Sequence, residues 1–135
     1  MKKASGVNNL EELIANMKPL LNEGEYVFAS VSNTASIPRD ITICEIKEKE
    51  GITIVLPKKD AERLGLPFDF VASWITLNIH SSLEAVGLTA AFSAELSENN
   101  ISCNVIAGYY HDHIFVDKKD EKKAMMVLQN MTKRT

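Results

Sequence analysis

The sequence predicts an α+β fold of ferredoxin-like architecture, with helices packed on one face of an antiparallel sheet. Residues 74–116 support it, because they read as strand, helix, strand and strand with short connections, which is one half of a ferredoxin-like unit. The first of these strands, residues 74–80, places Ile75, Leu77 and Ile79 at period two, as a half-buried strand requires. A helix lying on one face of such a sheet is the expected result.

The helix of this segment is predicted to begin at a capping box. Ser81 can accept a hydrogen bond from the amide at the third helical position, while Glu84 reaches back to the cap. Asn99 and Asn100 are expected to end the helix, since asparagine tolerates the left-handed conformation found at many helix ends. The apolar stripe that would face the core recurs at intervals of three or four residues: Ala85, Leu88, Phe92 and Leu96.

The next two strands are predicted from alternating apolar residues on either side of a turn. The first covers 101–107, residues 108–110 turn, and 113–116 return as the second. A last helix at about 119–131 turns four residues towards a core: Ala124, Val127, Leu128 and Met131.

The first half of the chain repeats this pattern more weakly. Asn9 and Glu12 form a capping pair before an amphipathic helix that Pro19 should end, and Gly24 should close the segment. Strands are predicted at 26–31, 41–46 and 52–56, with a charged hairpin turn at 47–51. Pro57 suits the first position of a short helix that stops at Gly65.

An internal repeat supports two units, which we expect at residues 1–70 and 71–135. Ile54–Asp60 aligns with Ile114–Asp120, sixty positions further on, and each segment is a strand end that turns into a helix. The second unit lacks the closing strand of a complete βαββαβ unit, so the strand should come from the first unit or from a second subunit. An unpaired sheet edge is rarely tolerated, and this edge predicts a homodimer.

Composition excludes several classes of function. Net charge is −3, from 15 basic and 18 acidic residues without a basic block, so the electrostatic basis for nucleic-acid binding is missing. The N-terminus does not read as a secretory signal, and no apolar run approaches the roughly 18 residues that a membrane span needs. Cys44 and Cys103 are isolated and predict reduced, buried thiols in a cytoplasmic protein, although a disulfide between them stays open.

The segment from Trp74 to Val116, and especially AVGLTAAFSAELSENNISCNVIAGYYHDHIFV within it, resembles the ACT-domain proteins. The resemblance is strongest to small bacterial proteins built from two tandem ACT-like units, which are related to the ACT modules of aspartate kinases and of cellular amino-acid sensors. Leu20–Phe28 resembles the first unit of that family more weakly. The resemblance implies a non-enzymatic regulatory protein without a cofactor, which binds an amino acid or similar small metabolite at an interface between units or subunits.

Two segments are candidates for that binding site. The helix start at 82–88 offers free amides and a partial positive charge that could hold a carboxylate. Gly87 is expected in the first helical turns, where glycine costs about 1 kcal/mol relative to alanine. Its missing side chain would admit a ligand or a neighbouring backbone, or would allow tight packing of helix on sheet.

The second candidate is the turn AGYYHDH at 107–113, which is rich in polar and aromatic side chains. Asp112 could pair with a ligand ammonium group, or could instead bond to the backbone of its own turn. With the resemblance, the two segments give these expected ligand-binding residues: Ala85, Val86, Gly87, Leu88, Asn104, Gly108, Tyr109, Tyr110, His111 and Asp112.

Three alternatives remain at this point. His111 and His113 would lie about 6 to 7 Å apart on one face of a strand, and His80 could supply a third nitrogen to a metal site or a metal-dependent enzyme. A purely structural dimerisation module would bind no ligand at all. A regulatory subunit of a separate amino-acid enzyme would act through that partner.

Overall fold

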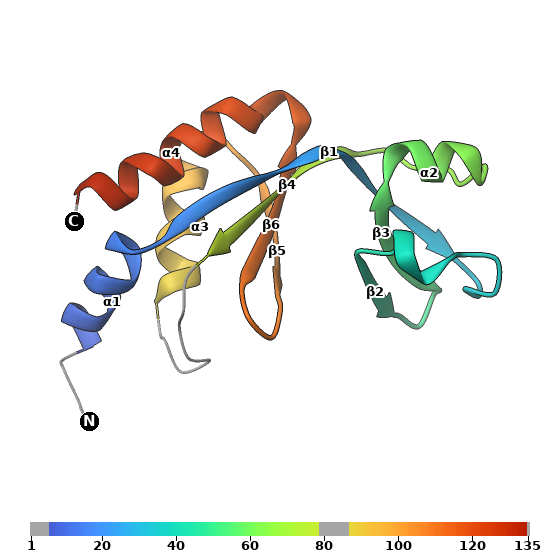
Figure 1. Ribbon diagram of the computed structural model, residues 1–135, viewed down its shortest axis with the longest axis horizontal. Helices are drawn as coiled ribbons and strands as arrows, with labels where there is room; N and C mark the ends of the chain where they lie inside the picture. The colour runs from blue at the N-terminus through green and yellow to red at the C-terminus, as the bar shows by residue number, and fades with distance from the viewer. Residues whose placement is uncertain (1–5, 79–86, 135) are drawn as a thin grey trace. The chain divides into compact units, whose positions relative to one another are not determined.

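The computed structural model describes residues 6–78 and 87–134, which fold as two compact units (Figure 1). Unit 1 combines Met1–Asn22 with Trp74–Thr135, and unit 2 is Glu23–Ser73. The start of β1 (Lys18–Val31) and most of β4 (Val71–Asn78) lie in unit 1. The other elements of unit 1 are α1 (Gly6–Ala15), α3 (Leu88–Glu98), β5 (Cys103–Ala107), β6 (Asp112–Asp117), the 3-10 helix η2 (Lys118–Asp120) and α4 (Glu121–Arg134).

Unit 2 contains the remainder of β1 and the first residues of β4. Between them come the 3-10 helix η1 (Arg39–Ile41), β2 (Cys44–Lys47), β3 (Ile52–Pro57) and α2 (Lys58–Arg63). Hydrogen bonds join the strands in the order β2-β3-β1-β4-β6-β5. The predicted α+β, ferredoxin-like fold with antiparallel strands is therefore confirmed.

The strand that the predicted second unit, residues 71–135, lacks is supplied by the same chain, within unit 1 of the structure. Lys18–Asn22, at the start of β1, belongs to this unit, and β1 neighbours β4 in the strand order. The sheet edge that predicted a homodimer is thus already covered, so that reason for a homodimer is wrong. The strand order leaves β2 and β5 at its two ends instead.

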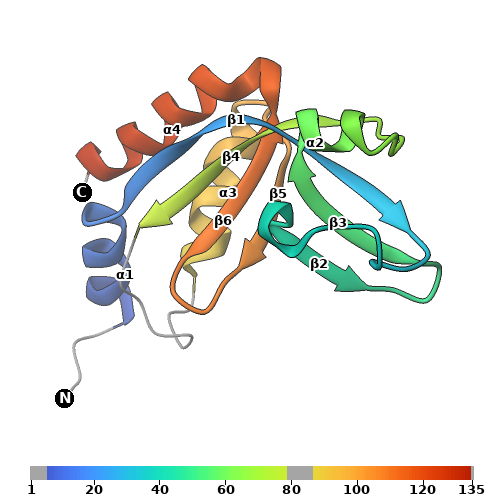
Figure 2. The ribbon, with the colours of Figure 1, turned by 45° about the vertical axis from the view of Figure 1, so that its right-hand side comes forward.

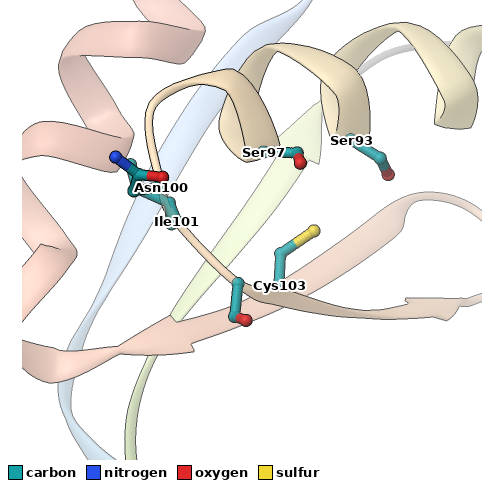
Figure 3. Close-up of a pocket in the computed structure, with 6 residues that line it drawn as sticks. Ser93, Ser97, Asn100, Ile101 and Cys103 are labelled. Carbon is teal, nitrogen blue, oxygen red and sulfur yellow. The ribbon is translucent and has the colours of Figure 1, made fainter.

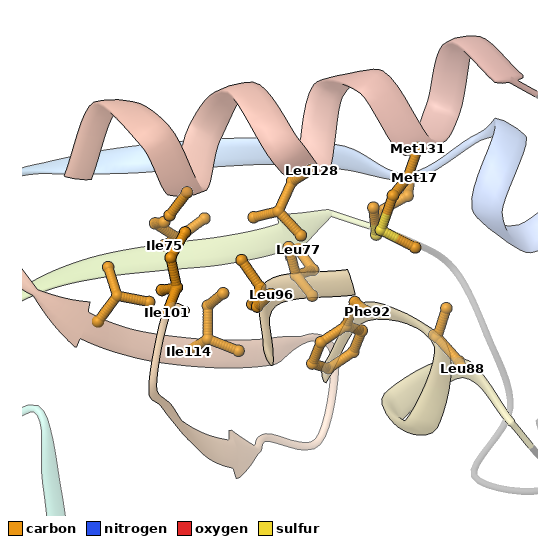
Figure 4. Close-up of a cluster of buried hydrophobic side chains, with 12 residues drawn as sticks. Met17, Ile75, Leu77, Leu88, Phe92, Leu96, Ile101, Ile114, Leu128 and Met131 are labelled. Carbon is orange, nitrogen blue, oxygen red and sulfur yellow. The ribbon is translucent and has the colours of Figure 1, made fainter. Parts of the chain in front are cut away.

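One hydrophobic core holds unit 1 together (Figure 4). Helices α3 and α4 pack on the same face of β4 and β6, as predicted, and α1 adds partly buried leucines to this core. The stripe on α3 is confirmed, because Leu88, Phe92 and Leu96 are at most 3% exposed, while Ala85 lies outside the described residues. Their core partners on the other elements include Ile75, Leu77, Ile114, Val116, Ala124, Leu128 and Met131.

Unit 2 has a smaller core of its own. Its buried members come from β1, β3, α2 and the loop before η1: Val27, Ala29, Ile37, Ile54, Leu56 and Ala61. The short helix α2 ends before Gly65, as predicted, and Gly65 has a positive φ of 71°.

Several predicted boundaries in the first half are wrong. Strand β1 begins at Lys18 rather than at Tyr26, because Gly24 adopts φ 105° inside the strand instead of ending a preceding segment. Helix α1 begins at Gly6, so Asn9 lies within it. Pro57 is the last residue of β3 and the N-cap of α2, one position before the helix.

The two ends of α3 differ in how well the sequence predicted them. Gly87 is the N-cap, with φ 95°, so its expected place within the first helical turns is wrong. The capping box of Ser81 and Glu84 lies outside the described residues. At the other end the prediction is confirmed: Asn99 is the C-cap and Asn100 adopts φ 60°.

The internal repeat is visible in the pairing of the two hairpins. Glu45 pairs with Ile54 in the β2–β3 hairpin, and Val105 pairs with Ile114 in the β5–β6 hairpin, each sixty positions later. Both turns are closed by the same type of backbone bond, from Glu48 N to Gly51 O and from Gly108 N to His111 O, each 2.9 Å long. Equivalent residues of the two hairpins can therefore be compared directly.

Candidate functional site

The candidate residues of unit 1 gather at one end of that unit. The start of α3 and the turn between β5 and β6 both lie towards the end of unit 1 where β4 finishes, in two views (Figures 1 and 2). Ala85 and Val86 lie outside the residues that the structure describes. Asn104 is exposed on β5, where it pairs with Phe115 rather than joining the turn.

At the start of α3, backbone conformation and packing together explain the glycine, because Gly87 has φ 95° and a close neighbour. A Cβ added to Gly87 would lie 3.3 Å from Cδ2 of Leu10 on α1. The Leu10 side chain therefore occupies the space that a ligand would need beside Gly87. Leu88 is 3% exposed and points into the core. The backbone amides of the first turn of α3 remain as groups that could bind an anion here.

The β5–β6 turn presents two aromatic rings to solvent. Tyr109 is 89% exposed and Tyr110 is 72% exposed, and their ring centroids lie 4.9 Å apart in an edge-to-face arrangement. Beneath them the amide of Gly108 donates to the carbonyl of His111. Asp112 follows as the first residue of β6, paired with Ala107, so the turn is held at both ends.

Among the described residues, the turn contains a buried side-chain atom without a hydrogen-bond partner. The Nδ1 atom of His111 is buried and makes no hydrogen bond within the described part of the chain. A buried polar atom without a partner costs free energy, so this nitrogen needs an explanation, such as a bound water, ion or ligand.

Sequence reasoning missed a polar network beside the turn. The Trp74 indole donates to Nδ1 of His113 over 3.1 Å, and the Thr76 hydroxyl lies 3.0 Å from the same nitrogen. The amide of Asn22 donates to the Thr76 hydroxyl at 2.9 Å. The alternation of residues along β4 could have indicated one part of this network, because it places residues 74 and 76 together on the face opposite Ile75 and Leu77.

The network fixes the protonation state of His113. An indole N–H can only donate, so Nδ1 must accept and the ring proton of neutral His113 sits on Nε2. Burial lowers the pKa of His113 below its usual 6.5, the nearby His111 lowers it further, and Asp112 acts in the opposite direction. The imidazole is therefore held neutral, with one defined donor.

Metal binding gains no support from the described residues. Among them, no group of three histidine, cysteine or acidic side chains could hold a metal ion. His80, the third ligand of the predicted metal site, lies outside that part of the chain. Cys44 and Cys103 are both free cysteines and only partly buried.

In the described part of the chain, each unit also has a hollow away from the predicted site. The larger, of about 530 Å³, lies in unit 1 between the end of α3 and the start of β5 (Figure 3). Ser93, Ser97 and Cys103 are among its lining residues, and burial raises the pKa of the Cys103 thiol while a hydrogen bond with Ser93 lowers it. The other, of about 400 Å³, lies in unit 2 beside Tyr26 and Lys58.

No helix in the described ranges is both long and apolar enough to cross a membrane.

Two family models, each described as an ACT domain, match the sequence at residues 5–73 and 70–130. A search of curated proteins found no significant match. Among solved structures, a Vibrio cholerae protein of unknown function, described as a possible transport protein, is 46% identical. The match covers 95% of this chain and 99% of that one, with a TM-score of 0.85.

More distant structures share the fold alone. A protein from Agrobacterium tumefaciens is 20% identical with a TM-score of 0.66, and the match covers 86% of this chain and 89% of that one. A putative C-terminal regulatory domain of aspartate kinase from Porphyromonas gingivalis is 14% identical with a TM-score of 0.60. That match covers 87% of this chain and 98% of the domain.

Proposed function

This chain belongs to the ACT-domain family, and we propose that it is a non-enzymatic regulatory protein that binds an amino acid or a similar small metabolite. ACT domains are regulatory modules that typically bind amino acids. The proposal takes residues 1–70 and 71–135 as the two ACT units of the sequence. It places the ligand at the end of unit 1 described above.

The observation that carries the proposal is a pair of opposite charges at that end of unit 1. The first turn of α3 offers backbone amides with a partial positive charge, which suits a carboxylate. Asp112 begins β6 at the neighbouring turn and supplies a carboxylate for an ammonium group. Together they suit the two charged groups of an amino acid.

A panel of thermal melts tests the proposal. We expect one or more of the common amino acids to raise the melting temperature, because a ligand at a hundred times its Kd stabilises a fold by about 2.7 kcal/mol. Asp112→Asn should then weaken binding of that amino acid by about 2 kcal/mol or more in calorimetry, without lowering the melting temperature of the free protein. Asp69→Asn makes the same charge change at an exposed position of unit 2 and should leave affinity unchanged.

Other results would reject the proposal. If Asp112→Asn binds normally, Asp112 has no part in the site, and if the variant fails to fold, the carboxylate serves its own turn. A melt that responds to zinc and to no amino acid would favour a metal site at His111 and His113 instead.

We also propose a homodimer, now formed through β5. Edge strands are commonly protected by charged side chains, and β2 carries Glu45 and Lys47, whereas the β5 sequence CNVIA is uncharged. Light scattering should give about twice the chain mass of 15.0 kDa. Ala107→Lys on β5 should produce monomers, while Ile46→Lys on β2 should not; a wild-type monomer at all concentrations would reject the dimer.

A further inference from the structure

The turn of the β5–β6 hairpin carries an aromatic pair that the equivalent turn of unit 2 lacks. Residues 48–51 read EKEG, whereas residues 108–111 read GYYH. Both turns close with the same backbone bond, so the geometry of the turn does not require the two tyrosines. Largely exposed tyrosine rings are typical of protein interfaces, where the ring is buried and the hydroxyl finds a partner.

The backbone of β5 shows which of its residues turn away from β6. The amide of Gly108 donates to the carbonyl of His111, and successive residues of an antiparallel strand alternate in the side to which they bond. The residues at 104 and 106 therefore bond towards β6, like Gly108. The others direct their amides and carbonyls to the outer edge of the strand: Cys103, Val105 and Ala107.

A second copy of the chain can bond to this whole edge in one register. With a two-fold axis at Val105, Cys103 of each copy pairs with Ala107 of the other, and all three edge residues are bonded. The same register continues past the strand, where it places residues 109 and 110 of one copy opposite residues 101 and 100 of the other. Each turn therefore reaches the start of β5 in the other copy.

The start of β5 borders the hollow of unit 1 (Figure 3). Residues 100–103 line one side of it, and Ser93 and Ser97 of α3 line the other. Its volume of about 530 Å³ is large enough for aromatic side chains, and its lining residues are uncharged. The two serine hydroxyls can bond to a tyrosine hydroxyl, and Ile101 and Cys103 supply apolar surface for a ring.

We propose that Tyr109 and Tyr110 of each copy dock into the hollow beside Cys103 of the other copy, at both ends of a β5–β5 pairing. This inference rests on the homodimer proposed above and names the side chains that hold it together. The two contacts are equivalent by symmetry, so each tyrosine pair is buried once and each hollow is filled once.

Analytical ultracentrifugation over a dilution series tests the role of the tyrosines. Replacing both, as Tyr109→Ser with Tyr110→Ser, should raise the Kd of the dimer at least tenfold. The two side chains are 89% and 72% exposed, so the variant should keep the circular dichroism spectrum of the wild type. Lys49→Ser with Glu50→Ser changes the equivalent turn of unit 2 and should leave the Kd unchanged.

A second pair of variants tests the hollow. Ser97→Phe places a ring at its lining and should also raise the Kd of the dimer at least tenfold. Ala94→Phe adds the same bulk at an exposed position of α3 that does not line the hollow, so it should dimerise like the wild type.

The Cys103 thiol gives a direct reading of the docked state. Cys44→Ser leaves Cys103 as the remaining cysteine of the chain. Its reaction with an uncharged thiol reagent should slow at least tenfold as the dimer forms. Removing the two tyrosines should abolish this protection, even at concentrations where the variant is still dimeric.

The outcomes separate this inference from the proposals on which it rests. A chain that stays monomeric at all concentrations overturns the dimer and the docking together. A dimer that Ala107→Lys disrupts but the loss of both tyrosines does not overturns the docking and leaves the β5 pairing intact. Equal dimerisation of Ser97→Phe and Ala94→Phe, or equal Cys103 reactivity in monomer and dimer, also overturns the docking. Amino-acid binding is decided by the thermal melts alone.

Discussion

Phe92→Ala lowers the free energy of unfolding by about 3 to 5 kcal/mol, the usual cost of removing a buried phenylalanine. The side chain is fully buried in the core of unit 1 (Figure 4). Its loss removes apolar contacts and leaves a cavity that the close-packed neighbours Leu88 and Leu96 cannot fill without moving. Chemical denaturation followed by circular dichroism measures the change.

Met126→Ala is the matched control for this prediction. Met126 lies on α4 but is 59% exposed, so its truncation should change the free energy of unfolding by less than about 0.5 kcal/mol. Equal effects of the two substitutions would mean that α3 is not packed on this core as described.

Gly87→Ala destabilises the protein by about 1 to 2 kcal/mol, because alanine pays that cost in the left-handed conformation. Gly87 has φ 95°, and the added Cβ also meets the side chain of Leu10 at 3.3 Å. Helix propensity alone would predict the opposite sign, since alanine is the best helix former. The N-cap position of Gly87, outside the helix, removes that benefit.

Gly65→Ala separates the cost of the left-handed backbone conformation from the cost of the contact with Leu10. Gly65 also has a positive φ, of 71°, but a Cβ there would meet nothing within 4 Å. Gly65→Ala should therefore show the backbone cost alone, and the coupling between Gly87→Ala and Leu10→Ala in a double-mutant cycle should give the part that is due to contact. A stabilised Gly87→Ala variant would show that Gly87 does belong to the helix.

The sequence predicted those features that depend on neighbouring residues. The apolar stripe of α3, the asparagines at its end and the two hairpins follow from local spacing, and all appear in the structure. The φ of Gly87 could not be predicted, because the same residue fits a helix turn or its cap, and tertiary packing of Leu10 decides between them.

The sequence indicated the local part of the candidate site but not the contacts between distant residues. The turn at 108–112 stands out by composition, and it lies where strand alternation placed it. The bond from Trp74 to His113 joins residues thirty-nine positions apart, and the bond from Asn22 to Thr76 joins residues fifty-four apart. Spacing along β4 places residues 74 and 76 on one face but does not identify their partners on other strands, so the network became visible only in the folded chain.

The use of the start of β1 by unit 1 makes unit 2 an insertion within unit 1. A fragment that begins at residue 70 would lack Lys18–Asn22 and the buried Met17, although it contains the whole second family match. Unit 1 must therefore bring together segments from opposite ends of the chain, and contacts of such long sequence separation slow folding. During synthesis, all residues of unit 2 leave the ribosome before the last strands of unit 1 do, so unit 2 is available to fold first.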